Sequence, residues 1–192
     1  NAAAVGAAEF VEHVDGNATV VFLNFGTGLA AGLVRDGQAE HGYSGFIGEI
    51  GHLPVDPNGF ECPCGQRGCL ETVASGGAVA KLWPSANPPM PDLIRKARQG
   101  DKRANDVLGK VAHGMGDVIQ IAAQAYDPQR IIIGGGMAKT GNDLIEVIQA
   151  ELSRRAEGCR FLNTLDIASN IRIAAVDKPI GAIGAALAAK RA

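Results

Sequence analysis

The chain has 192 residues, of which 46% are hydrophobic and 20% are charged, a balance typical of a folded domain and not of a disordered segment. Its 18 Lys and Arg residues against 20 Asp and Glu residues give a net charge of −2, which argues against a nucleic-acid-binding surface because phosphate binding requires a basic excess. The 26 glycines and 9 prolines form short clusters without a repeat, which excludes a collagen-like or low-complexity chain.

The chain begins at Asn1 without an initiator Met, and Val5, Ala8 and Val11 follow at helical spacing. We therefore expect the sequence to join a helix partway through and to be a fragment of a longer protein. No apolar stretch is long enough to cross a bilayer, and no basic segment with an apolar leader opens the chain. We expect a cytoplasmic protein with no membrane partner.

The next segments predict a β-hairpin. Asp15–Asn17 is a turn signal, and the apolar, β-branched and aromatic run Ala18–Phe25 predicts a buried strand. Gly26–Gly28 turns the chain into a second predicted strand, Leu29–Val34. A glycine-rich loop then leads to a predicted short strand at His52–Asp56.

The rest of the chain alternates between helical and strand patterns. The expected elements are a helix over Leu70–Trp83, a proline-rich loop over Pro84–Pro91, helical structure from Asp92 to Tyr126, a buried strand at Arg130–Ile133, a helix over Gly141–Glu157, a strand at Ile171–Val176 and a closing helix over Ile180–Ala189. This mixture predicts an α/β domain without repeats or linkers.

Three of the four cysteines lie in the segment Cys62-Pro-Cys64-Gly-Gln-Arg-Gly-Cys69, ten residues after His52. Three thiolates and one imidazole make a closed tetrahedral shell for a structural Zn²⁺ ion. A disulfide is the first alternative, but Cys62 and Cys64 are too close in sequence to bridge comfortably, and an intracellular chain would not keep the bond. A redox cysteine pair is the second alternative, although the motif is C-x-C without a thioredoxin-like unit. We expect zinc bound by His52, Cys62, Cys64 and Cys69.

Two glutamates flank this predicted metal loop. Glu49 precedes His52, and Glu71 follows Cys69. Carboxylates in a fixed geometry accept hydrogen bonds from sugar hydroxyls, whereas the simpler interpretation is two solvated surface side chains. The fourth cysteine, Cys159, is expected to be an inert buried thiol.

The segment Gly48-Glu49-Ile-Gly-His52, followed by Cys62-x-Cys64-Gly-x-x-Gly-Cys69-Leu-Glu71, resembles the signature of the ROK family (repressors, open reading frames and sugar kinases). Gly26-Thr27-Gly28 and Gly134-Gly135-Gly136 resemble the nucleotide-facing segments of the same family. The resemblance covers residues 1–192. It implies the C-terminal lobe of an actin-like, ribonuclease H-like ATPase fold with a zinc-binding loop.

The resemblance also implies roles for single residues. Glu49, His52 and Glu71 match positions that hold the hydroxyls of a hexose or amino sugar, or of its phosphate, with one ring nitrogen of His52 on zinc and the other facing the sugar. The segments with Thr27 and Gly28 and with Gly134, Gly135 and Gly136 match those around ATP. Glycine there lets backbone N–H groups approach phosphate closely, although Gly134–Gly136 also fits a simple strand-to-helix turn.

Two departures from the family pattern bear on activity. Asn1 matches the last residue of an Asn-Asp-x-Asn run whose Asp is the general base, so the expected catalytic Asp lies upstream of Asn1 and no catalytic residue is expected in this chain. The phosphate loop of the N-terminal lobe is also absent from the sequence, and we expect the chain alone to be inactive. The first glycine loop has Ala30 where kinases usually have glycine, and its methyl group could crowd a phosphate or prevent a positive φ.

Two functions follow from the resemblance. Ala30 favours the sugar-sensing domain of a transcriptional regulator, which would contact DNA only through a missing N-terminal domain. The alternative is the C-terminal lobe of an ATP-dependent hexose or amino-sugar kinase that uses Mg²⁺. The family also implies a homo-oligomer. His13, His41 and His113 are expected to be surface or capping residues without identifiable partners, and Trp83 is expected to close a helix end.

Overall fold

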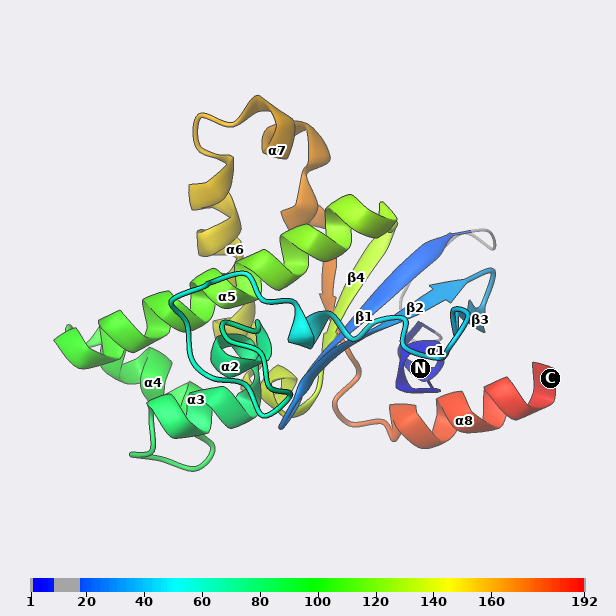
Figure 1. Cartoon of the computed structure of the whole chain (residues 1–192), viewed down its shortest axis with the longest axis horizontal. Helices are drawn as coiled ribbons and strands as arrows, with labels where there is room; N and C mark the ends of the chain where they lie inside the picture. Colours follow the sequence, from blue (N-terminus) through cyan, green and yellow to red (C-terminus); the bar gives the residue numbers. More distant parts are fainter. Residues whose placement is uncertain (1, 9–17, 192) are drawn as a thin grey trace.

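The computed structural model describes residues 2–8 and 18–191. The predicted turn at 15–17, the helical positions 11 and 12, His13 and Asn1 lie outside the described residues. In the described part, a single five-stranded sheet carries helices on both faces (Figure 1). The predicted α/β class is therefore confirmed.

The sheet has the strand order β3-β2-β1-β4-β5. Its strands are β1 (Thr19–Phe25), β2 (Leu29–Arg35), β3 (Gln38–Ala39), β4 (Arg130–Gly134) and β5 (Ile171–Ile173). β1 and β2 form the predicted antiparallel hairpin, whereas β1 pairs with β4 in parallel, with Asn24 opposite Gly134. Because neighbouring parallel strands end at the same edge, the segments after β1 and after β4 leave the sheet side by side.

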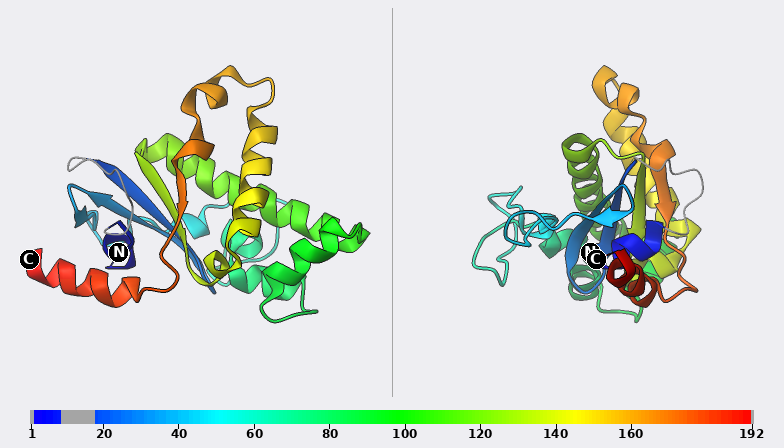
Figure 2. Two further views of the ribbon diagram at one scale, coloured as in Figure 1. Left: turned by 180° about the vertical axis from the view of Figure 1, so that it is seen from behind. Right: turned by 90° about the vertical axis from the view of Figure 1, so that its right-hand side faces the viewer.

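Side chains of the central strands alternate between two apolar layers. Val21, Leu23 and Phe25 pack into a large core under α4 (Pro89–Arg98), α5 (Lys102–Tyr126) and α6 (Asn142–Ala156). Val20 and Phe22 face a smaller cluster under α1 (Ala2–Ala8) and α8 (Ile180–Arg191). The views from behind and from the side show these layers on opposite faces of the sheet (Figure 2). The large layer gives the sheet a rigid base for the segments at its edges.

Several sequence expectations need correction. Residues 52–56 form no strand: His52 ends a 3₁₀ helix, η1 (Ile50–His52), and only Pro54 pairs, in a single bridge with Cys69. Proline has no N–H to donate to a ladder, and Pro54 and Pro57 are both in this segment.

The predicted helix over 70–83 is two helices, α2 (Glu71–Ala74) and α3 (Gly76–Leu82). Ser75 has an extended backbone between them, and its hydroxyl oxygen accepts a hydrogen bond from Ala78 N–H, 3.0 Å away. Trp83 closes α3 as expected, and its buried indole N–H donates to Asp92. The predicted proline loop ends early, because α4 begins at Pro89.

Several short elements were not predicted, among them β3 and η3 (Ile167–Asn170). Gly136–Thr140 also forms a 3₁₀ helix, η2, before α6, and α7 (Arg160–Leu165) follows α6. None of the residues of α7 is buried, although Leu162 and Leu165 pack against the large core. Cys159 was expected to be buried, but it is half-buried at the N-cap position of α7.

An ionic cluster joins α5 to α6. The Arg155 guanidinium donates to Asp117 Oδ1 at 2.8 Å, to Glu151 Oε1 at 2.7 Å and to the His113 carbonyl oxygen at 2.7 Å. His113 also lies 3.3 Å from Glu151 through Nδ1, so the expectation that His113 has no partner is wrong. Burial would raise the pKa of Glu151, but hydrogen bonds from Arg154 and Arg155 lower it to about 2.

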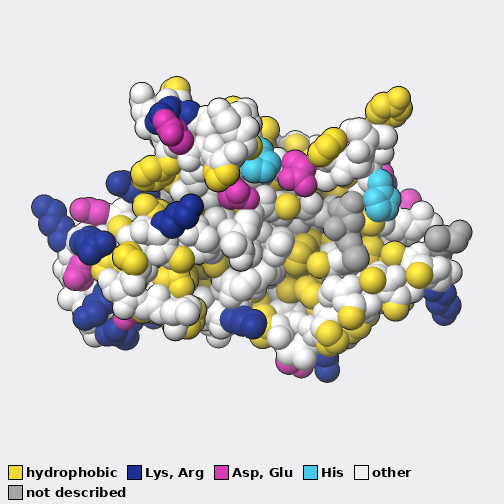
Figure 3. Space-filling model, turned by 60° about the horizontal axis from the view of Figure 1, so that its bottom comes forward, with side chains coloured by type: hydrophobic (Ala, Val, Ile, Leu, Met, Phe, Trp, Pro, Cys, Tyr) yellow, Lys and Arg dark blue, Asp and Glu magenta, His cyan; other side chains and the backbone are white. Residues whose placement is uncertain are grey.

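Many of the basic side chains on the face shown in Figure 3 lie at the left end of the molecule. Two basic side chains of α4 are paired with carboxylates: Arg95 with Asp92, and Arg98 with Asp143 and Glu146. Among the described residues, no helix is both long and apolar enough to span a membrane.

Candidate functional site

The four predicted metal ligands come together. The ligand atoms of His52, Cys62, Cys64 and Cys69 all lie within 4.8 Å of one another. Cys62 Sγ is 3.7 Å from His52 Nδ1, and Cys64 Sγ is 3.7 Å from Cys69 Sγ. A tetrahedral site with zinc–sulfur bonds of about 2.3 Å has sulfur–sulfur edges of about 3.8 Å. The described geometry therefore fits a Zn²⁺ ion, with Nδ1 as the ring nitrogen of His52 that faces it.

The pKa values of the thiols differ within the cluster. Burial, with the neighbouring thiols of Cys62 and Cys64, raises the pKa of Cys69 to about 12. In contrast, hydrogen bonds from the backbone and side chain of Gln66 lower the pKa of Cys64 to about 6. Buried thiolates need a compensating positive charge, and metal binding supplies it while it displaces the thiol protons. The cluster therefore offers four ligand atoms that could hold a metal ion.

Short backbone contacts build the loop that carries the cluster. Cys62 N–H donates to the Gln66 carbonyl oxygen at 2.8 Å, and Gly65 N–H donates to the Cys62 carbonyl oxygen at 2.9 Å. The Gln66 side chain donates to the His52 carbonyl oxygen at 2.9 Å and to Cys64 Sγ at 3.5 Å. Sequence reasoning treated Gln66 as a spacer, although a polar side chain between two ligands was a signal that it supports them.

The segment with Glu49 lies directly against β2. Gly48 has a backbone φ of +93°, and a Cβ at Gly48 would stand 2.0 Å from the Ala31 carbonyl oxygen. A Cβ at Gly51 would stand 2.1 Å from the Leu29 carbonyl oxygen. Only glycine permits this approach of backbone to backbone. The two glycines fix Glu49, which is exposed and precedes η1, beside the start of β2.

Glu71 reaches the same place from the other side. It is half-buried at the start of α2, and its Oε2 accepts a hydrogen bond of 2.8 Å from Leu29 N–H. The bridge between Pro54 and Cys69 and the hydrogen bond from Leu70 N–H to the Leu53 carbonyl oxygen join its segment to that of His52. Glu49, His52 and Glu71 therefore stand on three adjoining segments around the first residues of β2.

The two glycine segments meet at one edge of the sheet. Gly135 has φ +80°, and a Cβ there would stand 2.6 Å from Gly26 N and 2.5 Å from the Phe25 carbonyl carbon. Gly136 is exposed, with open space where a side chain would point, and Thr27 is also exposed. Backbone groups that lie bare at the ends of adjacent parallel strands are suited to a phosphate-bearing ligand.

Gly134 is buried inside the fold, unlike the exposed Gly136. It is the last residue of β4 and is buried, and a Cβ there would stand 2.2 Å from the ring of Phe22. Packing against that ring explains why glycine is needed at this position. Asn24, an exposed polar residue in the otherwise apolar β1, lies next to Gly135: a Cβ there would be 2.6 Å from Asn24 Oδ1. Its polarity within an apolar strand was the signal that sequence reasoning missed.

Ala30 imposes no backbone strain. It lies in β2, opposite Asn24, and it is not among the described non-glycine residues with positive φ, which are Asp36, Asp127 and Asp166. A positive φ is therefore not required at this position.

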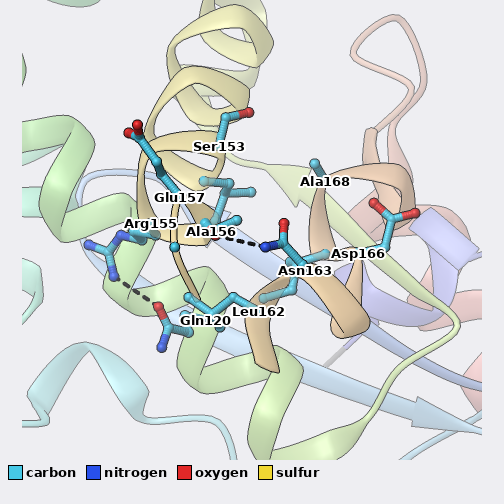
Figure 4. A pocket seen from close by; sticks show the side chains of 12 residues that line it. Gln120, Ser153, Arg155, Ala156, Glu157, Leu162, Asn163, Asp166 and Ala168 are labelled. Atoms are coloured by element: carbon cyan, nitrogen blue, oxygen red, sulfur yellow. Dashed lines mark hydrogen bonds between the residues drawn. The ribbon is translucent and has the colours of Figure 1, made fainter. Parts of the chain in front are cut away.

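Two cavities lie away from this edge. One, of about 790 Å³, separates the metal loop from α5, and Cys69, Thr72, Lys110, His113 and Asp117 are among its lining residues. The other, of about 320 Å³, lies between α5, the end of α6 and α7 (Figure 4). Some of its polar side chains bond within the chain: Asn163 Nδ2 donates to the Ala156 carbonyl oxygen at 2.9 Å, and Arg155 donates to Gln120. Neither cavity is lined by Glu49, His52 or Glu71.

Curated proteins similar to this chain include both kinases and transcriptional regulators. A glucokinase from Halalkalibacterium halodurans is 32% identical over 193 residues, which cover 88% of this chain and 56% of that protein. The transcriptional dual regulator NagC of Escherichia coli is 32% identical over 141 residues, which cover 67% of this chain and 35% of the regulator. The chain thus spans about half the length of the glucokinase, and kinases and regulators are both among its relatives.

Solved structures of ROK family kinases are also similar to this chain. A ROK family glucokinase from Streptomyces griseus, in complex with glucose and AMPPNP, matches with a TM-score of 0.76 at 28% identity, over 100% of this chain and 66% of that one. A ROK hexokinase from Thermus thermophilus matches with a TM-score of 0.74 at 29% identity, over 98% of this chain and 62% of that one. The family model described as "ROK family" matches residues 1–192. The chain therefore belongs to the ROK family.

Proposed function

We propose that this chain is the hexose-binding C-terminal lobe of an ATP-dependent sugar kinase. The observation that carries the proposal is the close approach of two glycine turns, Gly26–Leu29 and Gly135–Gly136, beside the segments of Glu49, His52 and Glu71. A kinase needs a phosphate-bearing ligand and a sugar hydroxyl next to each other, because phosphoryl transfer depends on positioning and on charge neutralisation.

Each residue in this proposal has a distinct task. Glu49 and Glu71 accept hydrogen bonds from hexose hydroxyls, and His52 offers the ring nitrogen Nε2 to the sugar while Nδ1 faces the metal cluster. Zn²⁺, held by His52, Cys62, Cys64 and Cys69, would supply structural cross-linking of the loop. The backbone at Thr27, Gly28, Gly135 and Gly136 would hold phosphate oxygens of ATP, and Mg²⁺ would neutralise their charge. The general base, an Asp in the proposal, belongs to the segment before Asn1.

A second candidate function is the sugar-sensing lobe of a transcriptional regulator. The 32% identity to NagC over 67% of the chain supports it, and the sugar-binding residues would serve it equally well. A regulator of this kind needs a hexose to shift the equilibrium between two conformations, but it does not need phosphate held at the glycine turns.

Nucleotide dependence separates the two candidates. A protein that joins this chain to the N-terminal lobe required by the proposal would be incubated with Mg²⁺, ATP and, in turn, glucose, N-acetylglucosamine and N-acetylmannosamine, and ADP release would be measured. A kinase releases ADP only when its sugar is present. If a sugar binds, as measured by calorimetry, while ADP release stays at the sugar-free level, the kinase proposal fails and the regulator stands. The oligomeric state, expected to be a homo-oligomer, can be measured by light scattering on the same sample.

A further inference from the structure

Glu71 connects two parts of the site that the sequence keeps 42 residues apart. Its Oε2 accepts a 2.8 Å hydrogen bond from the backbone N–H of Leu29, the first residue of β2. Leu29 is 3% exposed and Glu71 is half-buried. A carboxylate bonded to a backbone N–H that is shielded from water makes a stronger hydrogen bond than a neutral acceptor does. One oxygen of Glu71 is therefore committed to the turn.

The same turn rests on the residues that follow Glu71. Gly76 N–H donates to the Gly26 carbonyl oxygen at 2.7 Å, and Gly77 N–H donates to the Thr27 carbonyl oxygen at 3.2 Å. The approach leaves no room for side chains, because a Cβ at Gly77 would be 2.4 Å from the Thr27 carbonyl oxygen and one at Gly28 would be 2.8 Å from Glu71 Oε2. The turn cannot shift without moving Glu71 or breaking this contact.

Glu71 is equally tied to the metal loop. It stands two residues after the ligand Cys69, and Leu70 N–H donates to the Leu53 carbonyl oxygen at 3.1 Å, one residue after the ligand His52. Among the described residues, the hydrogen bond from Leu29 is the one that engages the Glu71 carboxylate. Its second oxygen, Oε1, is thus the atom left to accept a bond from a ligand.

We propose that Glu71 is a positioning residue that couples hexose binding to the Gly26–Leu29 turn, with Oε2 holding the turn and Oε1 holding a sugar hydroxyl. The proposal rests on the proposed function for its hexose, but the turn contact stands on the geometry alone. A hexose that fixes the carboxylate also fixes Leu29 N–H, and the turn is then ordered before a phosphate-bearing ligand arrives. Hexose binding should therefore raise the affinity for the phosphate-bearing ligand. By thermodynamic linkage, that ligand raises the affinity for hexose by the same factor.

Hydrogen exchange of the Leu29 amide tests the turn contact. In the chain without sugar, Glu71→Ala should speed exchange at Leu29 by about tenfold, the effect of losing one hydrogen bond of ordinary strength. Glu71→Gln keeps an acceptor oxygen and should retain most of the protection. The matched control, Glu157→Gln, changes an exposed glutamate outside the site and should leave Leu29 unchanged. Protection at Ile132, in the centre of the sheet, verifies that each variant is folded.

Addition of glucose, and of N-acetylglucosamine in a parallel experiment, tests the coupling. The sugar that binds, as judged by calorimetry, should slow exchange at Leu29 in the unmodified chain, but not in folded Glu71→Ala. Sugar binding without any change at Leu29 overturns the coupling, and unchanged Leu29 exchange in sugar-free Glu71→Ala overturns the turn contact. Absence of binding by both sugars overturns the hexose part together with the proposed function, while the sugar-free comparison still decides the turn contact.

Discussion

The side-chain amide of Gln66 donates a 2.9 Å hydrogen bond to the backbone carbonyl oxygen of His52, fourteen residues earlier in the chain. The same amide nitrogen lies 3.5 Å from Cys64 Sγ. Gln66 therefore links the two arms of the metal loop, and it donates to a ligand sulfur. Partners of this kind orient metal ligands and commonly change metal affinity by about 10–100-fold when they are removed.

We predict that Gln66→Ala binds zinc but releases it about tenfold faster to an excess of a coloured chelator than the unmodified chain does. Gln99→Ala serves as the control, because Gln99 is an exposed glutamine at the end of α4, far in sequence from the ligands. Equal release rates for Gln66→Ala and the unmodified chain would show that the amide does not support the cluster.

The ligand assignment has a direct test in Cys64→Ser. A serine hydroxyl is a poor replacement for thiolate, so we expect loss of stoichiometric zinc and a lower melting temperature, since structural metal binding is coupled to folding. Elemental analysis and thermal unfolding measure the two effects. Cys159→Ser is the matched control, because Cys159 lies outside the cluster, and it should keep the metal. One equivalent of zinc in purified Cys64→Ser would contradict the assignment.

Gly135 and Gly136 are neighbours with different surroundings. Gly135 has φ +80°, and a Cβ there would overlap the backbone of Phe25 and Gly26, whereas a Cβ at Gly136 would meet nothing within 4 Å. We predict that Gly135→Ala lowers the free energy of unfolding by about 2 kcal/mol or more, and that Gly136→Ala changes it by less than about 1 kcal/mol. Denaturant titration measures both. Equal stability of the two variants would contradict the close contact between the glycine turns.

Glu151 gives the fold a defined sensitivity to acid. Its pKa of about 2 in the folded chain lies below the ordinary value of 4.5, so its ionised form stabilises the fold above about pH 4.5, and the contribution disappears as the pH falls toward 2. We predict that Glu151→Gln is less stable than the unmodified chain by about 2–4 kcal/mol at pH 7, because Arg155 then loses the more buried of its two carboxylate partners.

The stability difference should narrow steadily between about pH 4.5 and the lowest pH at which the chain stays folded. Glu157→Gln, on an exposed site near the end of the same helix, should differ from the unmodified chain by less than about 0.5 kcal/mol at every pH. A difference for Glu151→Gln that does not vary with pH would mean that ionisation of this carboxyl is not the source of the stability.

The parts of this fold that were predictable are those that local sequence determines. The apolar and β-branched run Ala18–Phe25 and the turn at Gly26–Gly28 predicted the hairpin, and the helical pattern up to Tyr126 predicted the end of the long helix. The cysteine spacing predicted the metal cluster, because thiolates and imidazole are specific in their chemistry. These signals need only a few neighbouring residues.

The parts that could not be predicted depend on contacts between distant backbone groups. The bond from Leu29 N–H to Glu71 spans 42 residues and leaves no pattern in the sequence of β2. Gly134 looked equivalent to Gly135 and Gly136, but only the fold shows that it packs on Phe22. His113 looked isolated because its partners Glu151 and Arg155 come from another helix.

The parallel pairing of β1 with β4 fixes the positions of the two glycine turns that follow these strands. Asn24 and Gly134 are in register, and adjacent strands lie about 4.8 Å apart. The glycine turns that follow the two strands are held next to each other, because a Cβ at Gly135 would stand 2.6 Å from Gly26 N. Their separation is therefore set by the backbone of the sheet and not by flexible side chains.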